Sequence, residues 1–169
     1  DVLGSRGLGD VYKRQEIATS VQALDRYVRN AEGVEEAASG DRLTLVTTDA
    51  DGIRQCAVIE YTEATWSGGR VDDYGSVVVK TRPYATGAGG AWSEHAVLTA
   101  VMNNSTASTS DDSLFKNKLF SMDGGTRVVR YSPVTGSYVG GKPVTSNTLT
   151  SFTARNVGSS ASVDFSQCR

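Results

Sequence analysis

The sequence has few of the residues that build metal centres or disulfide scaffolds. Its 169 residues include one histidine and two cysteines. Structural zinc sites and iron–sulfur clusters take most of their ligands from Cys and His, so this small supply argues against both. It also argues against a scaffold held by several disulfides. We therefore expect no metal site and no cofactor.

Basic charge and long apolar runs are also scarce. Lys and Arg number 17 against 19 Asp and Glu, the net charge is −2, and the isoelectric point is about 5.4. Such a chain lacks the basic surface that holds a nucleic-acid backbone, so we expect no nucleic-acid partner. No apolar run approaches the roughly 18 residues that a membrane-spanning helix needs.

Ser, Thr, Val and Gly are what the chain has in quantity. Hydrophobic residues make up 38% of the sequence and charged residues 21%, with 18 glycines and only three prolines. Abundant β-branched residues and frequent glycines favour strands joined by turns over a helical bundle. The length is that of one ordinary domain.

The first fifteen residues differ in character from the rest. Residues 1–15 (DVLGSRGLGDVYKRQ) show no sustained helical or strand period. The segment resembles a translated sequencing-adapter or linker artefact that recurs at the ends of environmental gene fragments. We interpret residues 1–15 as a non-native leader and leave them out of the fold prediction. The alternative interpretation is a genuine polar N-terminal arm.

An amphipathic helix is predicted over residues 16–39. Apolar side chains recur there at spacings of 4, 3, 4 and 3, which places them on one stripe of a helix. The predicted packing face consists of Ile17, Val21, Leu24, Val28 and Ala31. A helix of this length is marginal on its own in water, so we expect it to pack on a sheet.

The remainder, residues 40–169, is predicted to form a β-rich globular head. Two apolar runs flank an Asp-Gly turn at Asp51 and Gly52, which predicts a hairpin. Residues 92–102 fit either a bent strand or a short helix. Further strands are expected over residues 76–82, 126–132, 144–155 and 161–168, and exposed loops over residues 84–90 and 103–113. A helix followed by about six antiparallel strands predicts an α+β fold.

No motif in the chain predicts catalysis. The segment Gly136–Pro143 matches part of a P-loop, but proline stands where Mg²⁺ needs a hydroxyl, so a hairpin loop is predicted instead. Asp49 and Asp51 match part of a calcium loop that lacks its final bidentate acid, which indicates a plain turn. His95 is the only imidazole available as a general base, and no nucleophile elbow accompanies it. We predict a non-enzymatic protein without catalytic residues.

The two cysteines are interpreted as a pair. Cys56 lies inside an apolar run and Cys168 lies one residue from the C-terminal end of the chain. A bond between them would hold the terminal segment to the sheet, and the chain-entropy account assigns such a long loop roughly 4–5 kcal/mol. In an exported protein we predict the disulfide, and two separate buried thiols are the alternative.

The helix and the strands after it resemble a bacterial protein family. The stretch Leu24–Val34 (LDRYVRNAEGV) places Leu24 and Val28 on one side and Asp25, Arg26 and Arg29 on the other. This is similar to the second half of the N-terminal helix of type IV pilin-like proteins, which include minor pilins and type II secretion pseudopilins. The likeness spans about residues 16–61 and extends to the remainder only by architecture. It implies a pilin-like fold, with the helix packed on an antiparallel sheet.

The resemblance also implies a function. The chain would be a non-enzymatic minor pilin or pseudopilin subunit of a bacterial type IV pilus or type II secretion filament. Its partners would be other pilin or pseudopilin subunits, and a missing upstream apolar helix would anchor it in the cytoplasmic membrane before assembly. The expected location is the cell envelope or extracellular surface.

Several family features are absent from the chain. The prepilin cleavage motif, the methylated first residue, the Glu that guides assembly and the apolar half of the helix would all lie upstream of Glu16. A C-terminal Cys suits the family, but its disulfide usually encloses a short terminal region, and a partner as early as Cys56 departs from that habit.

The alternative function is a secreted β-rich binding module for a carbohydrate or a cell-surface polymer. In this interpretation, Trp66, Tyr74, Tyr84 or Trp92 would form a platform on which sugar rings stack.

Overall fold

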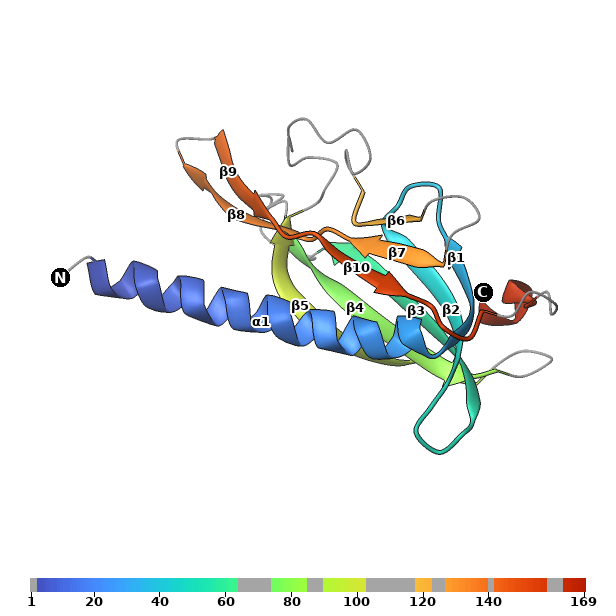
Figure 1. Cartoon of the computed structure of the whole chain (residues 1–169). Coiled ribbons are helices and arrows are strands. Elements are labelled where there is room, and N and C mark those ends of the chain that lie inside the picture. Colours follow the sequence, from blue (N-terminus) through green and yellow to red (C-terminus); the bar gives the residue numbers. More distant parts are fainter. Residues whose placement is uncertain are drawn as a thin grey trace.

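The computed structural model describes residues 3–63, 74–84, 90–102, 118–122, 127–139, 142–157 and 163–169. This part of the chain holds one long helix and ten strands (Figure 1). The helix α1 spans Leu3–Arg29, and a short 3-10 helix, η1, spans Phe165–Cys168. The first five strands are β1 Ala31–Glu36, β2 Arg42–Thr48, β3 Arg54–Glu63, β4 Tyr74–Pro83 and β5 Ser93–Met102. The other five are β6 Phe120–Met122, β7 Val128–Tyr131, β8 Val134–Val139, β9 Lys142–Asn147 and β10 Thr150–Thr153.

The strands form two antiparallel sheets. The larger sheet has seven strands in the order β1-β2-β3-β4-β5-β8-β9, and the smaller has three in the order β10-β7-β6. The large sheet curls around one side of α1. The small sheet lies over the side of the helix that the large sheet leaves uncovered (Figure 1). Glu36 links the two sheets, because its carboxylate accepts hydrogen bonds from the Met122 amide at 2.8 Å and from Lys118 Nζ at 3.2 Å.

The helix lies in the seam between the two sheets. Its principal packing partners are β5 of the large sheet and β10 of the small sheet. One core of buried side chains joins the helix to both sheets. Its largest fully buried members are Leu24 from α1, Leu43 and Leu45 from β2, Ile59 from β3, Leu98 from β5, Phe120 from β6 and Tyr131 from β7. The helix therefore completes the core that the two sheets leave open between them.

A buried polar contact marks the centre of this seam. Ser20 on α1 and Tyr131 on β7 are both fully buried, and their hydroxyl oxygens lie 3.4 Å apart. Burial raises the pKa of the Tyr131 hydroxyl far above its ordinary value, and the contact with Ser20 opposes this only in part. The tyrosine therefore stays neutral and serves as a packing residue.

The predicted α+β, pilin-like fold class is wrong. The structure is mostly β, with a curled seven-stranded antiparallel sheet, a second sheet and a single α-helix in its described part. The pattern of apolar residues indicated the helix and many strands, but it could not indicate that the strands divide between two sheets. The predicted strand over residues 144–155 is in fact β9 and β10, which belong to different sheets.

Several element boundaries also differ from the prediction. Residues 3–15, expected to lack regular structure, form the first half of α1, whereas residues 31–36, expected to be helical, form β1. The strand predicted over residues 161–168 is wrong, because Phe165–Cys168 is a 3-10 helix. The hairpin around Asp51 and Gly52 is confirmed: β2 and β3 pair across it, and Gly52 has the positive φ of 79° that favours glycine. Residues 92–102, which fitted two structures, contain the strand β5.

A row of charges crosses four neighbouring strands of the large sheet. Arg42 on β2 lies 3.7 Å from Glu60 on β3, and Lys80 on β4 lies 2.7 Å from Glu60 and 3.5 Å from Glu94 on β5. The hydrogen bond to Glu60 raises the pKa of Lys80, with partial burial opposing it and the charges of Glu60 and Glu94 adding to it. Cross-strand pairs of this kind support a sheet modestly.

We expect the contribution of Lys80 to disappear at alkaline pH. Since its pKa is raised in the folded state, the stabilisation is complete below the unfolded-state pKa of about 10.4 and is lost as the pH rises through the higher folded-state pKa. Urea unfolding of the wild type and Lys80→Met should differ by about 1 kcal/mol or less at pH 8, and the two should converge once the pH exceeds the raised pKa of Lys80. A difference that stays constant with pH would contradict this assignment.

Candidate functional site

The predicted packing face of the helix lies at the core. Leu24 and Val28 are fully buried, and Ile17 and Val21 are partly buried against the same cluster. Ala31 is also fully buried, but it belongs to β1 rather than to the helix. These residues hold the second half of α1 between the two sheets.

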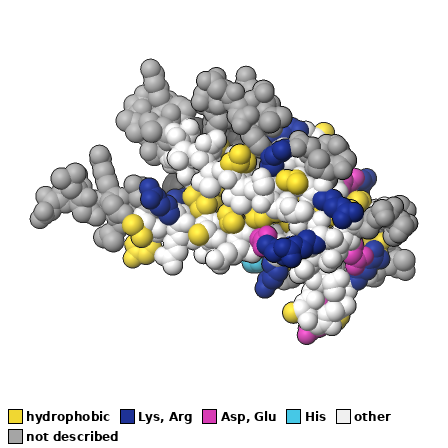
Figure 2. Space-filling view, viewed as in Figure 1, with side chains coloured by type: hydrophobic (Ala, Val, Ile, Leu, Met, Phe, Trp, Pro, Cys, Tyr) yellow, Lys and Arg dark blue, Asp and Glu magenta, His cyan; other side chains and the backbone are white. Residues whose placement is uncertain are grey.

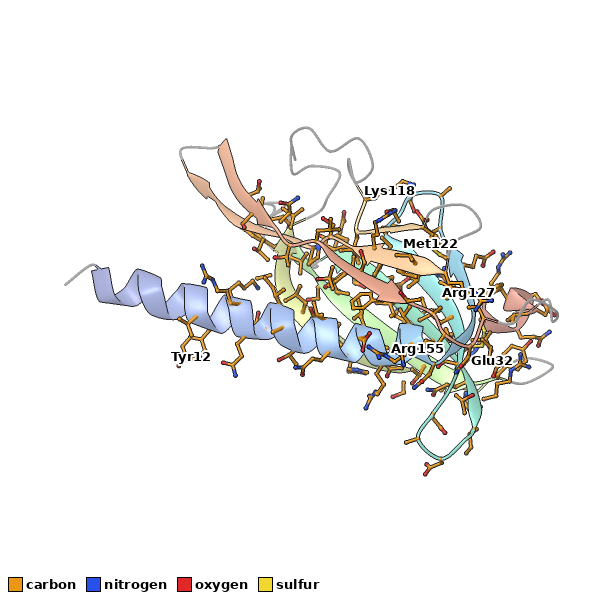
Figure 3. All side chains as sticks on the ribbon, viewed as in Figure 1. Tyr12, Glu32, Lys118, Met122, Arg127 and Arg155 are labelled. Carbon is orange, nitrogen blue, oxygen red and sulfur yellow. A yellow bond between two sulfur atoms is a disulfide. The ribbon has the colours of Figure 1, made fainter. Side chains whose placement is uncertain are left out.

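The N-terminal end of α1 extends beyond the β-rich body. The helix has 27 residues, which corresponds to about 40 Å, and its N-terminal end lies beyond the strands (Figure 1). Val11 and Tyr12, in the first half of the helix, are 60% and 65% exposed, and the Tyr12 side chain points away from the strands (Figure 3). Lys13 attaches this region to β5, because its ammonium group donates to the Thr99 carbonyl oxygen.

The outer face of the large sheet carries a second, smaller hydrophobic cluster. We call residues 163–169 the C-terminal strap. A disulfide joins Cys168 in the strap to Cys56 on β3, with the two sulfur atoms 2.02 Å apart. The cluster contains the fully buried Val46, Cys56 and Cys168, with Tyr84, Trp92, Val163 and Phe165 packed against them. Both faces of β2 are therefore covered, one by the main core and the other by the strap.

Two arginines fasten the strap to the sheet. Arg82 on β4 donates to the carbonyl oxygens of Gln167 and Arg169 at 2.9 and 2.8 Å, and its guanidinium carbon lies 4.4 Å from the centre of the Trp92 ring. The strap's own Arg169 makes an ion pair with Glu35 on β1 at 3.1 Å. These polar contacts hold the strap against the large sheet in addition to the disulfide.

The strap begins with a local cap. Asp164 Oδ1 accepts a hydrogen bond from the Ser166 amide at 2.9 Å, which caps η1. The hydrogen bonds from Ser166, followed by the one from Gln167, lower the pKa of the Asp164 carboxyl. The cap therefore favours the ionised carboxylate at neutral pH.

The aromatic platform predicted for sugar stacking is not assembled by the residues that the structure describes. Tyr84 and Trp92 lie together beside the strap, but Arg54 covers the Tyr84 ring at 4.2 Å and Arg82 covers the Trp92 ring. Tyr74 packs in another cluster with Met102 and Val134, at the opposite end of β4 from Tyr84. Trp66 lies outside the described residues.

The segments that resembled ligand-binding motifs have simpler structures. Residues 136–139 and 142–143 of the P-loop-like segment belong to the paired strands β8 and β9. Asp49 Oδ1 accepts hydrogen bonds from the Asp51 and Ile53 amides at 3.0 and 2.8 Å, so it stabilises the hairpin turn. His95 is exposed on β5. Across the described ranges, no three His, Cys, Asp or Glu side chains are grouped to hold a metal ion.

Comparisons with known proteins add no assignment. No protein-family model matches the chain, and neither a curated protein nor a solved structure matches it. In the part of the chain that the structure describes, no helix is long and apolar enough to cross a membrane.

Proposed function

We propose that the chain is a non-enzymatic subunit of a bacterial type IV pilus or type II secretion filament, of the minor pilin or pseudopilin kind. The observation that supports this proposal is the arrangement of α1. From residue 16 on, the helix is fixed in the core by Leu24 and Val28, and its axis points beyond the strands at the N-terminal end. A helix held in this way would direct native chain upstream of residue 16 away from the β-rich body. Residues 3–15, which we interpret as a non-native leader, follow that direction but are not part of the proposed subunit.

The remaining features agree with a role in assembly. The outer cluster and the disulfide stiffen the face of the sheet opposite the helix. The proposal depends on the helix and on the likeness of residues 24–34, and not on the fold class, because the two-sheet architecture differs from the pilin-like one. The proposed partners are other subunits of the filament and, through an upstream apolar segment, the cytoplasmic membrane.

The coding sequence upstream of residue 16 in the source genome provides the first test. We expect a glycine followed by about 20 apolar residues with an early glutamate, which is the length of a membrane-spanning helix. A globular extension in place of this segment would contradict the proposal.

Filament incorporation provides the second test. Expressed with its native upstream segment and its assembly machinery, the protein should be found in the membrane fraction and in sheared surface filaments. The control replaces the early glutamate by alanine, which should leave the protein in the membrane but remove it from the filaments. Equal amounts of both variants in the sheared fraction would count against the proposed assembly.

A further inference from the structure

We propose that a groove between the end of α1 and the β2–β3 hairpin binds a neutral polyhydroxylated ligand, such as one sugar unit of a glycan. We call this concavity the hairpin groove. The hairpin extends below the sheets near the C-terminal end of the helix (Figure 1). The groove between them has a volume of about 510 Å³. This volume falls within the range of about 300–1,000 Å³ that is typical of small-ligand sites.

A buried hydroxyl at the wall of the groove indicates a missing partner. Thr47 lines the groove and is only 1% exposed, yet its Oγ1 has no hydrogen-bond partner among the described residues. Thr47 follows Leu43 and Leu45 on the inner face of β2, so its side chain faces the helix. Buried polar groups are nearly always hydrogen-bonded, and one without a partner requires an explanation. A ligand hydroxyl seated in the groove would supply the missing bond.

Other polar side chains around the groove are available to a ligand. Asn30 and Arg26 reach it from the helix, and Asp51 and Gln55 from the hairpin. Within the described residues, none of these four side chains makes a side-chain hydrogen bond or an ion pair; Arg26 lies over the Tyr27 ring at 5.7 Å. By contrast, one oxygen of Asp49 is already used by the turn. The bonds of Asp49 therefore fix the turn of the hairpin, and the four side chains named above remain available to a ligand.

The chemistry of the groove favours hydroxyl groups over a charged ligand. It contains one guanidinium and two carboxylates, so an anion and a cation would each meet a like charge. The amides of Asn30 and Gln55 both donate and accept hydrogen bonds, and so does the hydroxyl of Thr47. A sugar hydroxyl also donates and accepts, so it can satisfy each of these groups in turn. Figure 2 shows basic and acidic side chains close together over this end of the molecule.

A titration followed by NMR tests this proposal on the whole chain. The ¹⁵N-labelled protein is titrated with glucose, galactose, mannose and N-acetylglucosamine up to about 50 mM, a range suited to weak binding. We expect saturable shifts for at least one sugar at the amides of residues 26–30 and 47–55. Sodium glutamate at the same concentration, as a charged probe, should not produce them.

The matched variants are Thr47→Val and Thr44→Val. Both remove a hydroxyl from β2, but Thr44 lies on the opposite face of the strand. Thr47→Val should fold normally, because it removes a hydroxyl without a partner, and it should weaken sugar binding about tenfold, as expected for one lost hydrogen bond. Thr44→Val should bind like the wild type. The proposal is overturned if no sugar gives saturable shifts, if glutamate gives the same shifts, or if Thr47→Val binds as tightly as the wild type.

Discussion

The double variant Cys56→Ala/Cys168→Ala is expected to lower the free energy of unfolding by about 4–5 kcal/mol. The bond joins residues 112 apart in the sequence, and the chain-entropy account assigns about this value to such a loop. Both cysteines are fully buried in the outer cluster, so the loss also loosens the packing of Val46 and Phe165. Urea or thermal unfolding of both proteins under non-reducing conditions measures the difference.

Reducing agent supplies the control for this experiment. Dithiothreitol should destabilise the wild type toward the level of the double variant and leave the double variant itself unchanged. Amide exchange should become faster in the strap through local opening, and the amides of the main core around α1, which exchange through global unfolding, should lose protection by about the same free energy as the unfolding experiment measures. A loss below about 1 kcal/mol would show that the hydrogen bonds of Arg82 hold the strap without the disulfide.

Leu24→Ala is expected to cost about 3 kcal/mol, within the range of about 2–5 kcal/mol for buried Leu-to-Ala changes. Leu24 is fully buried where α1 fills the seam between the sheets, so its loss leaves a cavity bordered by elements of both sheets. Since alanine is the better helix former, the loss cannot come from helix propensity. Chemical denaturation of the variant and the wild type measures it.

Gln22→Ala is the matched control on the same helix. Gln22 is exposed two residues before Leu24, and such surface changes usually remain within about 0.5 kcal/mol. If both variants lost the same stability, the effect would belong to the helix itself and not to its packing in the seam. If Leu24→Ala lost less than about 1 kcal/mol, the helix would not be needed to close the core.

Features that depend on neighbours in the sequence could be predicted well. The apolar repeat around Leu24 and Val28 predicted a buried helix face, and the Asp-Gly turn predicted the β2–β3 hairpin. The covered outer face could not be predicted in the same way. The run from Leu43 to Thr47 is buried at every position, which matches a strand covered on both sides, but nothing local identifies residues 163–169 as the cover.

The hairpin groove shows the same limit. The sequence indicated a turn at Asp49 and Asp51 and excluded a complete calcium loop. It could not show that Thr47 would be buried without a partner, because that depends on where the end of α1 lies across β2 and β3. The likeness to the pilin helix likewise covered a local stretch and led to the wrong fold class for the remainder.

The sequence by itself determined the periodic elements, the turn and the scarcity of catalytic and metal-binding groups, because these depend on side-chain type and on contacts over a few residues. Only the tertiary structure decided that the strands divide between two sheets, that α1 fills the seam between them, and that the strap covers the outer face. The physical reason is that these features come from contacts between segments far apart in the chain, as Cys56 and Cys168 are. The free energy of such contacts depends on the burial that the whole fold creates.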